Sequence, residues 1–93
     1  MDTYPQILFI EGTDEHDLKQ ADMKGLFGFD VKTSKDKTIR VHFMKLDLFA
    51  SAVRDEESQG RCYVLSETVI LTELTKEKMY GAIYYMLDNG YLE

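Results

Sequence analysis

The sequence predicts a single two-layer α+β domain over residues 1–93, and three patterns support this class. A contiguous apolar run at residues 7–10 is typical of a strand that is buried on both faces. Two alternating segments, residues 29–33 and 38–43, are typical of a β-hairpin. Helical spacing recurs over residues 75–87. The 93 residues are 44% hydrophobic with no low-complexity stretch between them, which indicates one core.

The first quarter of the chain predicts a strand and then a helix. Residues 6–11 contain the apolar run, and its lack of polar alternation indicates a central strand. Thr13 and Asp14 are favourable N-cap residues, and the acidic residues after them lie where a helix dipole is positive. We therefore expect a helix over residues 14–24. Its apolar face is thin and contains Leu18, Ala21 and Met23.

The middle of the chain predicts a hairpin and a second helix. Apolar and polar side chains alternate over residues 29–33 and 38–43, and the polar residues 34–37 form the turn. Because the side chains alternate, one face of this hairpin must be buried. Helical spacing follows over residues 45–57, where a polar run ends it. The apolar residues of this helix are Leu46, Leu48, Phe49, Ala52 and Val53.

The last third predicts a final helix and leaves the segment before it open. Residues 62–65 regain strand character and residues 69–71 form an apolar run, which fits either a hairpin or one strand and a linker. Thr75 can cap a helix that continues to about residue 87, where Asn89 and Gly90 stop it. The order β-α-β-β-α-β, with a further C-terminal helix, is that of a ferredoxin-like split βαβ domain with an addition.

The composition limits which cellular compartment and which classes of partner we expect. The N-terminus lacks the pattern of a signal peptide, and no apolar run approaches the roughly 18 residues of a membrane span, so we expect a cytoplasmic protein that does not contact a membrane. Cys62 is the single cysteine, which excludes an intrachain disulfide and fits a reducing compartment. The net charge of −6 repels a phosphate backbone and disfavours generic nucleic-acid binding.

No catalytic, metal or cofactor pattern stands out, so we expect neither an enzyme nor a metal or cofactor site. Cys62, His16 and His42 are the residues from which a nucleophile pair could be built, and predicted elements separate them. The densest set of potential metal ligands is Glu11, Asp14, Glu15, His16 and Asp17. Acidic residues at the start of a helix explain this set, because they oppose the positive end of its dipole. The glycines match neither phosphate-binding loop motif.

Basic residues concentrate on the predicted hairpin. Lys35, Lys37 and Arg40 are the candidate nucleic-acid contacts, and the strands that flank them lie where RNA-recognition domains place stacking aromatics. No Gly-Phe motif accompanies them, and lysines at a hairpin tip also discourage strand aggregation. RNA or DNA binding therefore ranks low among the functions considered.

The C-terminal helix is apolar over most of its circumference. One stripe contains Met79, Ala82, Ile83, Met86 and Leu87. A second, rotated stripe contains Tyr80 and Tyr84 and continues to Tyr91. A single sheet covers one side of such a helix, so the tyrosines indicate an association surface, since tyrosine is common where an interface is both apolar and wettable. The alternative is that residues 68–74 or the first helix cover the tyrosines within one monomer.

The leading hypothesis for function is a small, acidic, non-enzymatic protein-interaction module, an inhibitor or adaptor. It uses the tyrosine stripe and the acidic run Asp55, Glu56 and Glu57, whose charge would speed association with a basic or nucleic-acid-binding partner. Small acidic proteins can occupy basic nucleic-acid channels as phosphate mimics. Phage inhibitors of bacterial defence, including anti-CRISPR proteins, offer an analogy of class for this hypothesis.

The alternative hypothesis is a structural or regulatory homodimer in which the C-terminal helices of two copies pair. Light scattering separates the two hypotheses: a dimer that Tyr84→Asp converts to a monomer favours pairing of those helices. An RNA-binding domain and an enzyme rank below both hypotheses, because the sequence offers no basic surface beyond the hairpin and no nucleophile with a base.

Overall fold

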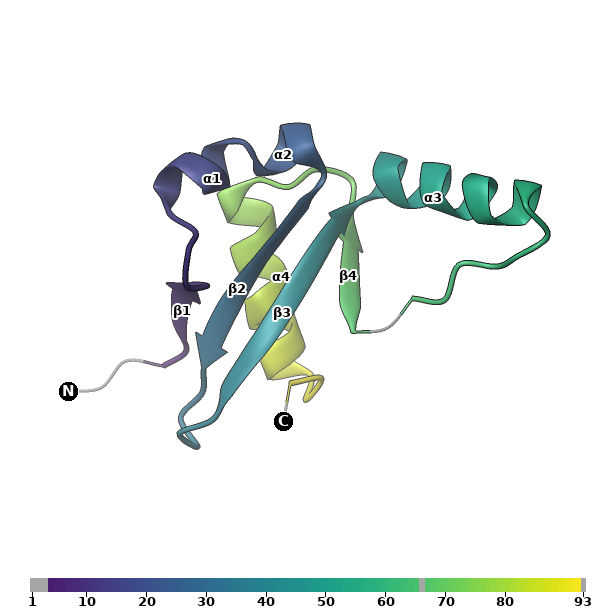
Figure 1. Ribbon diagram of the computed structural model, residues 1–93. Coiled ribbons are helices and arrows are strands. Elements are labelled where there is room, and N and C mark those ends of the chain that lie inside the picture. Colours follow the sequence, from purple (N-terminus) through teal and green to yellow (C-terminus); the bar gives the residue numbers. More distant parts are fainter. Residues whose placement is uncertain (1–3, 66, 93) are drawn as a thin grey trace.

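One mixed sheet of four strands organises the part of the chain that the computed structural model describes, residues 4–65 and 67–92 (Figure 1). The elements in chain order are β1 (Gln6–Phe9), α1 (Glu15–Lys19), α2 (Ala21–Lys24), β2 (Leu26–Lys32), β3 (Thr38–Lys45), α3 (Leu46–Ser58), β4 (Thr68–Leu71) and α4 (Lys76–Asp88). The predicted α+β class is confirmed.

The central hairpin forms as its alternation predicts. β2 and β3 pair antiparallel over the full length of β2, with Val31 opposite Ile39. The turn closes where the Thr33 amide donates to the Lys37 carbonyl at 2.8 Å, and Asp36 takes the left-handed φ of 59° that the turn requires. The hairpin supplies the two strands at the centre of the sheet.

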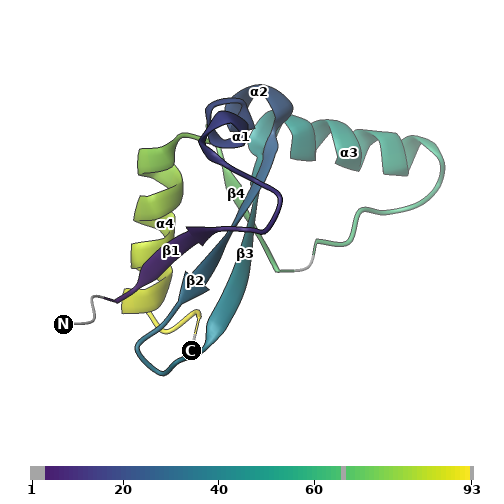
Figure 2. The same ribbon diagram turned by 60° about the vertical axis from the view of Figure 1, so that its left-hand side comes forward.

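The order of the strands is β1-β2-β3-β4, with β1 antiparallel to β2 and β4 parallel to β3. The ferredoxin-like arrangement is not confirmed, because a split βαβ unit separates sequence neighbours that here lie side by side. The prediction of a central first strand is wrong: β1 lies at the edge (Figure 2), and Leu8 and Phe9 are exposed. A short apolar run fits an edge strand equally well when only one of its faces meets the core.

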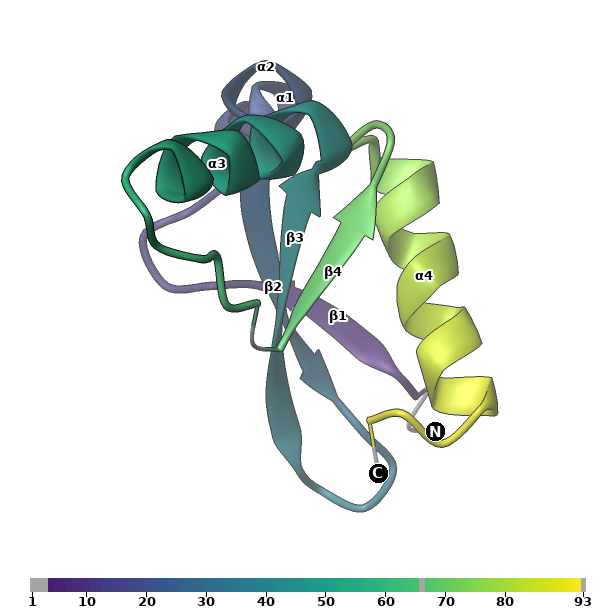
Figure 3. The ribbon, with the colours of Figure 1, turned by 90° about the vertical axis from the view of Figure 1, so that its right-hand side faces the viewer.

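α4 covers one face of the sheet (Figure 3) and forms the core with the hairpin. The predicted helix over residues 75–87 is confirmed, and the Thr75 hydroxyl caps it by accepting the Lys78 amide hydrogen at 3.2 Å. Gly90, with a φ of 75°, turns the chain after the helix ends. The buried apolar side chains are Leu18, Ala21, Phe29, Val31, Val41, Phe43, Leu74, Met79 and Ile83.

The helix predicted over residues 14–24 is two short helices that meet at Gln20. Asp14 caps α1 as expected: its side chain accepts the Asp17 and His16 amide hydrogens, and these bonds hold the pKa of the Asp14 carboxyl below its ordinary value. Leu18 and Ala21 are buried, whereas Met23, expected on the same apolar face, is exposed. Leu18 of α1 and Ala21 of α2 thus both reach the core, on either side of the break at Gln20.

Asp22 of α2 links three parts of the chain. Its carboxylate accepts the Leu74 amide hydrogen at 2.9 Å and receives the Lys45 ammonium at 3.1 Å. The Leu74 amide, and after it Lys45, lowers the pKa of the Asp22 carboxyl below its ordinary value. Because the group titrates lower in the folded chain, the stability that it contributes is present above about pH 4 and is lost as the pH falls through the lowered pKa.

Asp22→Asn is therefore expected to lower the midpoint of thermal unfolding at pH 7 and to flatten its decline between pH 5 and pH 2. Asparagine keeps an acceptor for the Leu74 amide but loses the charge, so its hydrogen bond is weaker and independent of pH. Lys45→Met, which removes the ammonium and leaves the Leu74 bond, is the matched variant and should cause the smaller change. An unchanged acid limb in Asp22→Asn would contradict this role.

α3 follows the predicted helix of residues 45–57 closely, but it does not pack on the sheet as a layer. It leaves the end of β3 and projects from the sheet on the side opposite α4 (Figures 1 and 3), and none of its described residues is buried. Residues 61–65 then return without forming a strand, and β4 covers residues 68–71. Of the two alternatives that the sequence left open, the structure has one strand and a linker.

Candidate association surfaces

The sheet has a second face that α4 does not cover, which we call the open face. Alternation along β2 and β3 sends Phe29 and Phe43 into the core, so the residues next to them in each strand point to the other face. Within the described residues, the open face carries Gln6, Leu8, Leu26, Gly28, Asp30, Lys32, Thr38, Arg40, His42, Met44, Thr68 and Ile70. Leu26 and His42 are exposed, so part of this face is apolar and open to solvent.

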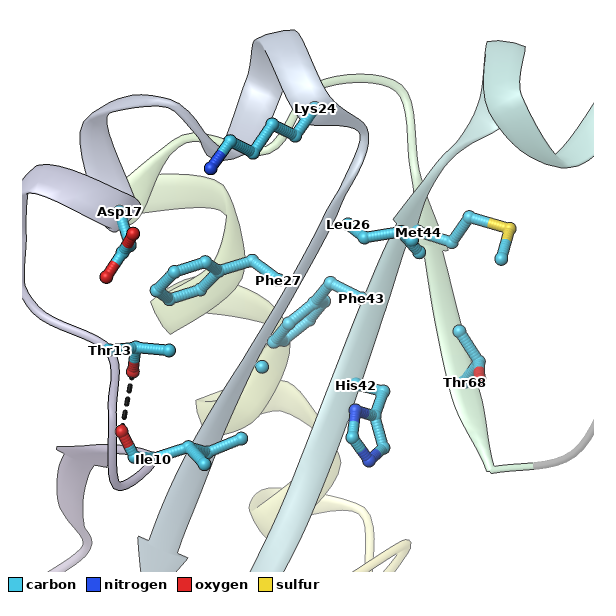
Figure 4. Close-up of a pocket in the computed structure, with 11 residues that line it drawn as sticks. Ile10, Thr13, Asp17, Lys24, Leu26, Phe27, His42, Phe43, Met44 and Thr68 are labelled. Atoms are coloured by element: carbon cyan, nitrogen blue, oxygen red, sulfur yellow. Dashed lines mark hydrogen bonds between the residues drawn. The ribbon is translucent and has the colours of Figure 1, made fainter.

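A hollow of about 460 Å³ lies on the open face (Figure 4). Gly28 forms part of its lining, and a Cβ there would come within 2.9 Å of Ile10 Cδ1 and 3.2 Å of the Val41 carbonyl oxygen. The lack of a side chain at residue 28 is therefore what lets the Ile10 side chain pack closely on the sheet at the edge of the hollow. The polar residues around it are Thr13, Asp17, Lys24, His42 and Thr68.

The chemistry of the hollow favours contact over catalysis. The Asp17 carboxylate accepts the Asp14 amide hydrogen at 3.0 Å, and the Thr13 hydroxyl donates to the Ile10 carbonyl at 2.7 Å. Both groups thus serve the start of α1. His42 lies opposite Thr68 across β3 and β4, and the remaining lining residues are mainly apolar, which leaves a mainly apolar surface with an imidazole at its side.

The α3 arm, defined as residues 46–65, holds together mainly through its own contacts. Phe49 meets Tyr63 edge to face with ring centroids 5.4 Å apart, and the Tyr63 hydroxyl lies 3.9 Å from the Met44 sulfur. At the far end, Arg61 forms two hydrogen bonds with Glu56, of 2.7 and 3.2 Å. The exposed large apolar residues of the arm are Leu46, Leu48, Val64 and Leu65.

The acidic run predicted to bind a partner, Asp55, Glu56 and Glu57, lies in the last turns of α3, and we call it the acidic tip. Glu56 is engaged by Arg61, whereas Asp55 and Glu57 are exposed. The C-terminal end of a helix carries partial negative charge, so carboxylates there oppose the dipole and reduce helix stability. No basic residue of the helix lies in its last turn. The positions of Asp55 and Glu57 are therefore not explained by the stability of α3.

The three tyrosines predicted as one stripe separate in the structure. Tyr80 is half-buried and meets Phe29 edge to face at 5.5 Å, so one monomer covers part of its side chain. Tyr84 and Tyr91 are exposed. Tyr80 therefore lies toward the sheet side of α4, apart from the exposed Tyr84 and Tyr91.

Tyr85 is an exposed residue that the sequence reasoning missed. The helix ends at Asp88, and the Tyr91 amide donates to the Met86 carbonyl at 2.8 Å, so Tyr91 no longer follows the helical spacing from Tyr84. Tyr91 instead stacks on Tyr85 with ring centroids 6.2 Å apart. Asn89 and Gly90, recognised as a stop, were the signal that the spacing ended there. The tyrosine surface therefore consists of Tyr84, Tyr85 and Tyr91.

The three basic candidates do not form one phosphate-binding cluster. Lys35 and Lys37 lie in the exposed turn. Arg40 lies on the open face and forms hydrogen bonds of 3.0 and 3.4 Å with Asp30, its partner across the strands; these bonds raise the pKa of the guanidinium. Because a carboxylate already faces Arg40, its charge attracts a nucleic-acid backbone less.

The residues considered for catalysis or metal binding also lie apart. His16 Nε2 contacts the Gln20 side-chain amide at 3.1 Å, while Cys62 is exposed on the α3 arm. Over residues 4–65 and 67–92, no three His, Cys, Asp or Glu side chains gather as metal ligands. In the same described part of the chain, the helices are too short or too polar to cross a bilayer.

Comparisons with protein-family models, with curated proteins and with solved structures found no match.

Proposed function

We propose that this protein is a non-enzymatic interaction module that binds a basic partner protein through the acidic tip of its α3 arm. The observation that carries the proposal is that Asp55 and Glu57 are exposed at the C-terminal end of a projecting helix. Charges that oppose a helix dipole reduce the stability of that helix, so a use in binding accounts for them where folding does not.

The shape and the charge of the molecule support this proposal. The described elements place α3 at the outer end of a particle that extends 53 Å in its longest direction (Figure 1), so the tip can reach a recessed surface. The net charge of −6 favours a basic partner and accelerates encounter with it. A nucleic-acid-binding protein offers such a surface, and the role would then be that of an inhibitor or adaptor. We place this function in the cytoplasm, where a free Cys62 stays reduced.

Reversing the charge of the acidic tip should abolish partner binding. In a pull-down from native lysate with the immobilised full chain, Asp55→Lys/Glu57→Lys is expected to lose the proteins that the unmodified chain captures. The captured proteins should be basic, and their retention should fall steeply between 50 and 300 mM salt, since exposed charges are screened over about 10 Å at 0.1 M.

The matched control is Glu11→Lys/Asp88→Lys, which makes the same change in net charge at two exposed residues outside α3. It should retain the captured proteins. If both double variants lose them equally, the overall charge and not the tip determines binding. Capture of acidic proteins, or capture that is insensitive to salt, would contradict the proposal.

The second candidate function is a structural or regulatory homodimer in which α4 of one copy meets α4 of another. The observation in its favour is the exposure of Tyr84, Tyr85 and Tyr91 on and just after α4. Aromatic rings of this kind are enriched in interfaces. Loss of dimerisation in Tyr84→Asp would support it.

A further inference from the structure

The open face and the α3 arm are two halves of a packing arrangement that one copy of the chain leaves incomplete. β3 and β4 are parallel neighbours joined by α3. Connections between parallel strands ordinarily lay their helix on a face of the sheet, where it covers apolar side chains. Here α3 buries none of its described residues, and the face on its side of the sheet keeps a hollow of about 460 Å³ (Figures 3 and 4).

Apolar side chains are exposed on both halves. The open face presents Leu26 and, on the edge strand, Leu8, while the arm presents Leu46, Val64 and Leu65. Large apolar side chains that lie together in the open are typical of association surfaces. Each half therefore offers an apolar surface that the other half can cover.

The area involved matches one standard interface. The chain exposes 6392 Å², whereas a compact monomer of 10.8 kDa is expected to expose about 5,500 Å². The excess of roughly 900 Å² is close to the roughly 800 Å² that each partner buries in a standard-size complex. The radius of gyration of 14.5 Å likewise exceeds the roughly 12 Å expected for a compact chain of this length.

We propose that a second copy of this chain covers the open face, with the α3 arm of each copy lying across the sheet of the other about a two-fold axis. A two-fold arrangement satisfies both halves at once, because the arm and the open face of each copy meet the open face and the arm of its partner. An exchanged element of this kind forms a closed pair and leaves no further open face to propagate the contact.

This pairing is independent of the proposed binding of a basic protein, since it uses apolar residues and not the acidic tip. The two also respond differently to salt. Two copies that each carry a net charge of −6 repel one another, so screening should strengthen the pair, whereas it should weaken binding of a basic partner. The pairing of two copies and the binding of a basic protein can therefore each be disproved without affecting the other.

The test is sedimentation equilibrium of the full chain at 1–200 μM. The unmodified chain is expected to reach twice the 10.8 kDa mass of one copy and to do so at lower concentration in 300 mM salt than in 50 mM. Leu26→Asp on the open face and Val64→Asp on the arm place a carboxylate in the interface, and each should raise the dimer Kd about 30-fold or more. The monomer should tolerate both changes, because Leu26 is 51% exposed and Val64 is 79% exposed.

Two control variants locate the interface. Met23→Asp, at a side chain that is 78% exposed on α2, and Tyr84→Asp on α4 should leave the dimer Kd unchanged within about two-fold. Circular dichroism of each variant checks that it is folded. A monomeric unmodified chain over the whole range, or a dimer that survives both Leu26→Asp and Val64→Asp, overturns the proposal. A dimer that only Tyr84→Asp dissociates also overturns it, and assigns the interface to α4.

Discussion

Phe29→Ala is expected to lower the free energy of unfolding by about 3–5 kcal/mol, which is a large part of the roughly 5–15 kcal/mol that stabilises a domain. The Phe29 ring is 1% exposed and lies at the centre of an aromatic cluster with Phe9, Phe27 and Tyr80, at centroid distances of 6.0, 5.0 and 5.5 Å. Its removal leaves a cavity where β1, β2 and α4 meet. Urea unfolding followed by circular dichroism measures the loss.

The control for Phe29→Ala is Met23→Ala, which truncates an exposed apolar side chain and should change the free energy of unfolding by less than about 0.5 kcal/mol. A loss below about 1 kcal/mol in Phe29→Ala would contradict the position of this ring, because it would mean that the sheet does not bury Phe29 against α4.

Ile83→Ala has the second largest expected effect, a loss of about 2–5 kcal/mol in the free energy of unfolding. Ile83 is completely buried on the side of α4 that faces the sheet, and it belongs to the same core as Phe43 and Met79. Tyr84 is the next residue but lies on the exposed side, so Tyr84→Ala should change the stability of the monomer by about 0.5 kcal/mol or less.

Thermal or urea unfolding at low protein concentration measures the free energy of unfolding of Ile83→Ala and Tyr84→Ala without a contribution from association. Equal losses in Ile83→Ala and Tyr84→Ala would show that α4 is covered on both sides. The expected difference between the two losses in free energy of unfolding therefore also tests whether the tyrosine surface is exposed in one monomer.

Local patterns predicted the hairpin and α4 well, and the reason is physical. Alternation over residues 29–33 and 38–43 determines which side chains of neighbouring strands share a face, and residues 34–37 close the turn over a short distance. For α4, the hydroxyl of Thr75 and the left-handed Gly90 define the two ends of the helix by contacts within a few residues. Such features depend little on the rest of the fold.

Features that depend on distant contacts were not predictable in this way. An apolar run such as residues 7–10 is compatible with a central strand and with an edge strand, and pairing with β2 decides between them. Similarly, the apolar spacing of α3 predicts a helix but does not specify which surface covers it. The order of the strands in the sheet follows from these pairings, so the ferredoxin-like expectation could not be checked before they were seen.

The same distinction between local and distant contacts applies to the candidate surfaces. The exposure of Asp55 and Glu57 could be anticipated, since a run of charged residues is rarely buried. The open face could not be anticipated, because it exists only when α4 covers one face of the sheet and α3 leaves the other face uncovered. For the tyrosines, the end of α4 at Asp88 breaks the spacing that the sequence reasoning extended to Tyr91.

Amide hydrogen exchange of α3 tests the central claim of an unpaired arm and an open sheet face most directly. At 1 μM, the amides of residues 47–58 should exchange much faster than those of α4 and of the β2–β3 pair, since no residue of α3 is buried. At 200 μM they should become protected as association covers them. Protection of α3 equal to that of α4 at 1 μM, with no change on concentration, would contradict the claim.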